Sequence, residues 1–119
     1  MIRYKVIEDQ KMVIAILDNS NRDGSKDERT CRNDAVSKVR KLIPWELSDE
    51  DKKILQMAPR YVGKAVCHND DVFDVEEGKR IAKKKVLDKY HNALHRRVSK
   101  FYSRKISEAK NLVHYLNKN

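Results

Sequence analysis

The strongest constraint on the fold is a long C-terminal stretch in which nothing interrupts a helix. No Pro follows Pro59 and no Gly follows Gly78, and strong helix formers dominate from Val75 onward. On a helical wheel the apolar side chains fall on one side: Leu87, Tyr90, Leu94, Val98, Phe101, Ala109, Leu112, Val113 and Leu116. The cations fall on the other: Lys85, Lys89, Arg96, Arg97, Lys100, Arg104, Lys110 and Lys118. This pattern predicts a long, basic, amphipathic helix.

A single helix over this stretch would be about 65 Å long, roughly twice the width of a domain of this size. Two arrangements would cover its apolar stripe. Either the helix breaks near His91–Ala93 and folds back as a helical hairpin, or the stripe packs against a second subunit. The second arrangement predicts a homodimer through the C-terminal helix.

The N-terminal part of the chain predicts a small antiparallel sheet. Residues 2–8 alternate apolar and polar side chains, and residues 11–18 form a compact β-branched run, so the two segments predict a β-hairpin. Residues 60–68 predict a third strand, with Gly63, Ala65 and Cys67 on one face. Asp74 has the chemistry of an N-cap, with Glu77 at the reciprocal position of a capping box, and the long helix is expected to begin at Val75. Gly78 is expected to let this helix approach the sheet closely.

Two short helices are expected between the second and third strands. One begins at Asn33, places Val36, Val39, Leu42 and Ile43 on one side, and must end at Pro44. The other is capped by Ser48 with Asp51 and closed by Pro59. Trp45 between them is interpreted as a core or lid aromatic, and residues 19–32 as an exposed loop. The fold class is therefore α+β, a three-stranded antiparallel sheet with two short helices and the long C-terminal helix. We expect one domain over residues 1–119, with residues 1–73 forming the sheet part and residues 74–119 the helical part.

Positive charge is concentrated in the C-terminal third. The chain carries a formal net charge of +9, yet residues 1–78 hold 14 basic and 16 acidic side chains, whereas residues 79–119 hold 13 basic and two acidic ones. A solvated helix normally interleaves Glu with Lys. Here the cations of the predicted helix are expected to be nearly unpaired, which favours a polyanionic partner. The predicted contact residues are Lys85, Lys89, Arg96, Arg97, Lys100 and Arg104. No base-reading motif is present, so contacts to nucleic acid would be made chiefly to phosphates.

Metal binding and catalysis find little support in the sequence. Asp88, His91 and His95 share one side of the predicted helix and could converge on an ion, but a further ligand would have to come from elsewhere. Cys31 lies in a polar loop, and Cys67 is expected inside a strand as a small buried hydrophobe. The acidic clusters at residues 48–51 and 70–71 begin or precede helices, where capping explains them. We therefore expect a protein without enzymatic activity, cofactor or catalytic residue.

The chain is expected in the cytoplasm. Its N-terminus carries charges where a signal peptide needs an apolar run, and its longest apolar stretch, residues 12–17, is too short to span a bilayer. Without a cysteine-dense framework, both cysteines are expected to be reduced.

The segment from Gly63 to Ala82, GKAVCHNDDVFDVEEGKRIA, resembles a stretch found in small uncharacterised accessory proteins of phages and prophages of Gram-positive bacteria. There a strand of the type G-x-A-x-C leads through an acidic turn and Phe-Asp into a helix. The matching positions are Gly63, Ala65, Cys67, Asp71, Phe73, Asp74, Gly78, Ile81 and Ala82. The resemblance implies a phage context and the cytoplasm of the bacterial host, but no activity.

Two functions fit this combination. In the first, the protein is a non-enzymatic phage or mobile-element accessory protein that binds nucleic acid through the basic helix face. In the second, it is a small inhibitor of an acidic host protein, such as an anti-CRISPR-type protein, which acts by docking a charged surface. The sequence leaves open whether the partner is DNA, RNA or protein.

Overall fold

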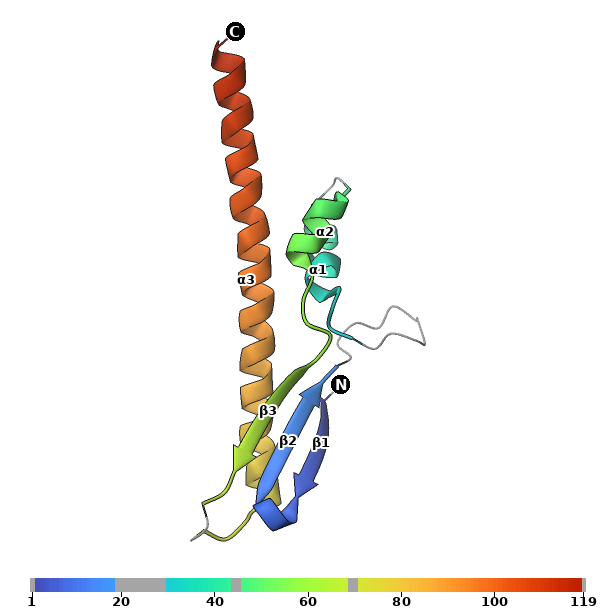
Figure 1. Cartoon of the computed structure of the whole chain (residues 1–119), viewed down its shortest axis with the longest axis vertical. Coiled ribbons are helices and arrows are strands. Elements are labelled where there is room, and N and C mark those ends of the chain that lie inside the picture. The colour runs from blue at the N-terminus through green and yellow to red at the C-terminus, as the bar shows by residue number, and fades with distance from the viewer. Residues whose placement is uncertain (1, 19–29, 44–45, 69–70, 119) are drawn as a thin grey trace.

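The computed structural model describes residues 2–18, 30–43, 46–68 and 71–118. In chain order the elements are β1 (Ile2–Ile7), a short 3-10 turn η1 (Glu8–Gln10), β2 (Met12–Leu17), α1 (Asp34–Leu42), α2 (Asp49–Leu55), β3 (Tyr61–Val66) and α3 (Val75–Lys118). Figure 1 shows the sheet crossing the lower part of α3, with α1 and α2 beside its middle. The predicted α+β fold is confirmed. The interpretations of Trp45 and of residues 19–29 lie outside the described residues.

The three strands form one antiparallel sheet in the order β1-β2-β3. Ile7 lies opposite Met12 across the hairpin, and the chain turns through η1 and Lys11, whose φ is 47°. β3 pairs with the other side of β2, with Val66 opposite Met12. Within the described sheet β3 is therefore an edge strand, with one line of backbone groups that no strand of this sheet satisfies.

α3 covers one face of this sheet because alternate strand residues turn toward it. Val13, Ala15 and Leu17 of β2 are buried, and so are Ala82 and Val86 of the helix. Gly63 brings β3 against the helix backbone, since a Cβ at this position would lie 2.5 Å from the Ala82 carbonyl oxygen and 2.6 Å from the Val86 nitrogen.

The helix also approaches β2 closely through its own glycine. A Cβ at Gly78 would lie 2.7 Å from Cγ2 of Val13, which confirms the expectation that Gly78 lets the helix lie near the sheet. A Cβ at Gly78 would also lie 3.9 Å from Cε1 of Phe73.

α1 and α2 form a second part of the core against the middle of α3. The buried apolar side chains there are Cys31, Ala35, Val36, Val39, Leu47, Leu55, Met57 and Phe101. Leu42, expected on the apolar side of α1, is instead 82% exposed, because it lies in the last turn of that helix. The capping box of α2 is confirmed, since Ser48 Oγ accepts from the Asp51 backbone N–H at 3.1 Å and the Ser48 N–H donates to Asp51 Oδ2 at 3.2 Å.

α3 runs for 44 residues without a break. It continues through His91–Ala93, so the hairpin arrangement is wrong. The molecule measures 72 × 33 × 18 Å as a result, and the end of α3 extends well beyond α2 (Figure 1). Every described side chain from Ile106 to Asn117 is exposed. None of the described helices is long and apolar enough to cross a membrane.

Candidate functional site

The candidate site lies on α3, and the start of this helix is fixed by local chemistry. Oδ1 of Asp74 accepts from the backbone N–H groups of Glu76 at 3.1 Å and Glu77 at 3.3 Å, which confirms Asp74 as the N-cap. The Glu77 carboxylate makes no described hydrogen bond with the backbone N–H of Asp74, so the reciprocal half of a capping box is not formed. Glu77 pairs with Arg80 of the next turn, and this pairing holds the pKa of the Glu77 carboxyl below its usual range.

The six predicted contact residues divide into two groups around α3. Lys85, Lys89, Arg96 and Lys100 are spaced by four, seven and four residues, so they fall within about 60° of one another around the helix. We call these four residues the basic face. It extends about 22 Å along the helix axis. Arg97 and Arg104 fall outside it and are both half-buried.

Lys85 and Lys89 of the basic face also donate hydrogen bonds to the edge strand of the sheet. Lys85 Nζ donates to the carbonyl oxygen of Lys64 at 2.9 Å, and Lys89 Nζ donates to the carbonyl oxygen of Val62 at 2.8 Å. Both acceptors belong to β3. An ammonium group has three donors, so each lysine keeps two beyond the carbonyl contact and also keeps its charge.

Arg96 and Lys100 continue the basic face beyond the sheet. Both side chains are exposed. Among the described residues, no Asp or Glu lies within ion-pair distance of any of the four members of the basic face. Its charge is therefore not neutralised within the part of the molecule that the structure describes.

Arg104 is different, because its guanidinium is engaged on two sides. It contacts Glu50 of α2 at 2.6 Å and Glu108 of its own helix at 3.1 Å. The expectation that the cations of α3 are nearly unpaired is thus wrong at Arg104. One of its two partners, Glu50, is 54 residues away in the chain, so no spacing along the helix could indicate that contact.

Lys105 makes a similar contact to a buried carboxylate. Its Nζ lies 3.0 Å from Asp51 Oδ1, and Asp51 is only 3% exposed. Burial alone would raise the pKa of Asp51, but the Lys105 ammonium and the hydrogen bonds from Ser48 outweigh it and hold this pKa below its usual range. Asp51 in turn raises the pKa of Lys105. The acidic cluster at residues 48–51 therefore has a structural role.

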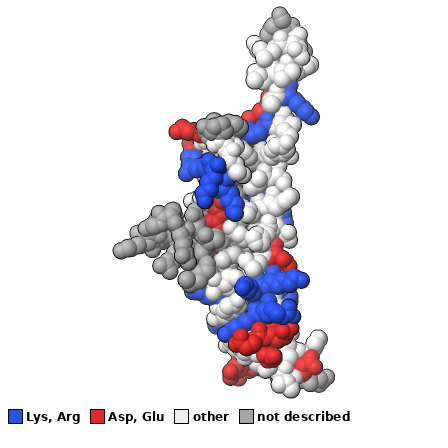
Figure 2. All heavy atoms as spheres, turned by 180° about the vertical axis from the view of Figure 1, so that it is seen from behind, with Lys and Arg blue, Asp and Glu red and all other residues white. Residues whose placement is uncertain are grey.

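Two further exposed cations, Lys83 and Lys84, were not among the predicted contact residues. With Arg80, Asp88 and His91 they line an open groove on another side of α3. Figure 2 shows one patch of Lys and Arg in the lower half of the molecule, next to a patch of Asp and Glu, and further Lys and Arg in the upper half. The run of three lysines at positions 83–85 was the sequence signal for this second cationic area.

The metal hypothesis gains no support. Asp88 and His91 line the same groove, yet in the described parts of the chain no three His, Cys, Asp or Glu side chains are placed to hold an ion. The groove is instead dominated by the cations of Arg80, Lys83 and Lys84, which oppose the binding of another cation.

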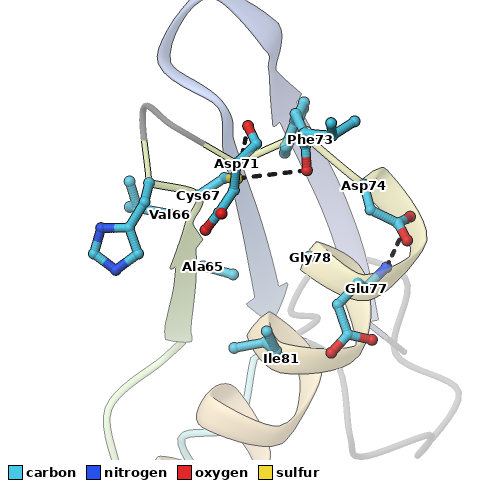
Figure 3. Close-up of a pocket in the computed structure, with 11 residues that line it drawn as sticks. Ala65, Val66, Cys67, Asp71, Phe73, Asp74, Glu77, Gly78 and Ile81 are labelled. Atoms are coloured by element: carbon cyan, nitrogen blue, oxygen red, sulfur yellow. Dashed lines mark hydrogen bonds between the residues drawn. The ribbon is translucent and has the colours of Figure 1, made fainter.

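A pocket of about 280 Å³ lies where β3 leads into α3. Figure 3 shows Ala65, Phe73 and Ile81 around it, with the carboxylates of Asp71, Asp74 and Glu77 nearby. Cys67 also lines it and follows β3 rather than lying inside the strand, which corrects the expected position. Its Sγ donates weakly to the carbonyl oxygens of Asp71 and Val72, at 3.8 and 3.7 Å. These contacts give Cys67 a structural role.

Cys31 also differs from its expected environment. The polar residues around it in the sequence indicated an exposed loop, but its side chain is fully buried and its Sγ donates to the Leu17 carbonyl oxygen at 3.6 Å. Cys31 and Cys67 are both free thiols.

Comparison of the chain with protein-family models, with curated proteins and with solved structures gives no match.

Proposed function

We propose that the protein binds nucleic acid through phosphate contacts made by the basic face. It would act in the bacterial cytoplasm as a non-enzymatic accessory protein of a phage or another mobile element. The observation that carries the proposal is the line of four cations on α3 with no described carboxylate within ion-pair distance.

The neighbours of the basic face support phosphate as the ligand. Asn92, Ser99 and Ser103 are exposed and lie on the same side of α3 by helical spacing. Amide and hydroxyl groups of this kind donate hydrogen bonds to phosphate oxygens alongside Lys and Arg. Neither Asp88 nor Glu108, the two acidic residues of the chain after Glu77, falls between the four cations on the wheel.

Charge reversal at the exposed end of the basic face tests the proposal. The double variant Arg96→Glu and Lys100→Glu removes two cations that make no described contact with the folded core, so folding should be retained. Each lost phosphate contact reduces the slope of log affinity against log salt by about 0.9 for duplex DNA. We expect the slope to fall by about two and the affinity for duplex DNA at low salt to fall at least about tenfold, measured by fluorescence anisotropy.

The matched control is the double variant Arg40→Glu and Lys41→Glu on α1. It replaces the same two residue types, both exposed, and changes the net charge equally. It should leave the salt slope close to that of the natural chain. An equal loss in both variants would show that only net charge matters. Absence of binding to duplex DNA, single strands and RNA at low salt would overturn the proposal and favour the acidic host protein instead.

A further inference from the structure

The end of α3 has the apolar pattern of a helix that packs in a protein core, yet its large apolar side chains are exposed in the part of the chain that the structure describes. Leu112, Val113 and Leu116 are exposed by 60, 56 and 61%, and Ile106 by 37%. Their positions on the wheel span about 120°, which is the width of the apolar side of a helix packed in a protein core. On the face that Figure 2 shows, this end of the molecule displays almost no Lys, Arg, Asp or Glu.

The exposed apolar residues follow the spacing of a coiled-coil seam. Tyr102, Ile106, Ala109, Val113 and Leu116 are separated alternately by four and three residues. We call these five residues the tip stripe. A groove runs along it between Ile106, Ala109 and Val113 on one side and Lys110, His114 and Asn117 on the other. A second helix with the same spacing could place its side chains in such a groove.

Residues 106–117 are also the part of α3 where two positively charged copies of the chain can approach each other with little charge repulsion. Glu108 is neutralised within its own helix by Arg104 at 3.1 Å and Lys105 at 3.2 Å. Of the charged side chains between Ile106 and Asn117, only Lys110 then lacks a carboxylate partner among the described residues. The remaining polar positions are uncharged Ser and Asn, together with His114.

We propose that the tip stripe binds the tip stripe of a second copy of this chain, with the two helices antiparallel and Ala109 opposite Ala109. In this register Tyr102 faces Leu116 of the other copy, and Ile106 lies opposite Leu112, one residue from Val113. The small side chains at the centre let the helix axes come close, and the larger ones cover the ends.

Charge decides the direction of the pair. A parallel pair would place the two stretches from Lys83 to Lys105 side by side, and in each copy seven cations of this stretch have no described carboxylate partner, against the single carboxylate of Asp88. The antiparallel pair places these stretches at opposite ends. Arg96 and Lys100 lie about 120° and 160° around the helix from the middle of the tip stripe, so pairing leaves the basic face open.

Sedimentation equilibrium of the full chain tests the proposal. Across the micromolar range the natural chain should approach twice its mass of 14.0 kDa. The double variant Val113→Glu and Leu116→Glu should shift the dissociation constant upward at least about tenfold. Both positions are exposed in the monomer, so the variant should remain folded, with an unchanged helical circular-dichroism spectrum.

The matched control is Ser107→Glu with Asn111→Glu, which adds the same charge to the opposite side of the same turns. It should dimerise at least one order of magnitude more tightly than the stripe variant. A monomeric natural chain, or equal weakening by both double variants, would overturn the proposal. So would a monomer that uses the tip stripe to bind anionic vesicles, since the stripe would then contact lipid.

Disulfide trapping tests the direction. In a Cys67→Ser background, Tyr102→Cys and Leu116→Cys should each fail to cross-link alone but cross-link when the two proteins are mixed. Cross-linking of each alone, as a parallel pair requires, would overturn the antiparallel arrangement.

Salt separates this proposal from nucleic-acid binding. Dimerisation of two positively charged copies should strengthen as salt screens their repulsion, whereas phosphate binding should weaken. Loss of one behaviour without the other would show which proposal had failed.

Discussion

Asp34 is a buried carboxylate with only part of its hydrogen-bonding capacity used. Its Oδ2 accepts from the Tyr90 hydroxyl at 2.7 Å, but its buried Oδ1 has no partner among the described atoms. Burial raises the pKa of Asp34, and the hydrogen bond from Tyr90 and the nearby Lys38 only partly oppose this. The folded state therefore holds the Asp34 proton more tightly than the unfolded state does.

This predicts a specific pH dependence for Asp34→Asn. A carboxyl with a raised folded pKa adds stability below its unfolded pKa and loses it as pH rises through the folded pKa. Asn mimics the protonated form, so the variant should be more stable at pH 7, by about 1 kcal/mol. The gain should shrink as pH falls toward 4, as measured by urea unfolding. A difference that stays constant over this range would contradict the role assigned to ionisation.

Single residues also show where sequence patterns stop being informative. The N-cap Asp74 and the close approach at Gly78 were predictable, because both depend on neighbours a few residues away or on the absence of a side chain. The burial of Cys31 was not, since polar neighbours dominate its sequence window while Leu17 and Pro59 contact it in space.

Among the secondary-structure elements, α2 is joined to α3 by the contact between Asp51 and Lys105. Asp51 is buried and Lys105 is 29% exposed, so the pair is only partly screened by solvent. Lys105→Met keeps the aliphatic stem but removes the ammonium, which leaves the Asp51 carboxylate with the Ser48 contacts alone. We expect a loss of about 1–2 kcal/mol in the free energy of unfolding at pH 7.

The loss should depend on pH in the opposite direction to the effect at Asp34. The folded pKa of Asp51 is lowered, so its stabilising contribution is present above the unfolded pKa and is lost as pH falls through the folded pKa. The natural chain and Lys105→Met should therefore converge in stability at strongly acid pH. The control is Lys110→Met, which removes an exposed cation near the end of α3 and should change the free energy of unfolding little. Equal losses in Lys105→Met and Lys110→Met would argue against a stabilising pair of Asp51 and Lys105.

Every helix and strand of the described fold was predictable as an element, because apolar periodicity, Pro and capping residues are local signals. The sequence did not predict whether α3 breaks near His91. The apolar pattern continues through this point, and it is compatible with both a helical hairpin and an unbroken helix. The contacts of Lys85 and Lys89 with β3 were equally hidden. On the wheel these lysines look like free cations, and only the packing of α3 against the strand brings carbonyl oxygens to them.

For the whole molecule, shape is the clearest test of an unbroken helix. The radius of gyration is 19.7 Å, whereas a compact chain of 119 residues would have about 13–14 Å. Small-angle X-ray scattering of the monomeric variant Val113→Glu and Leu116→Glu should give a value near 20 Å. A value near 14 Å would mean that α3 folds back in solution.

The uninterrupted length of α3 would also set a spacing. If two copies pair at Ala109, the middle of each basic face lies about 25 Å from the centre of the pair, at 1.5 Å per residue. The two faces are then about 50 Å apart, which corresponds to roughly 15 base pairs of duplex. A hinge in the helix would let this separation vary. A continuous helix keeps it constant, so the pair would act as a rigid spacer between two stretches of phosphate backbone.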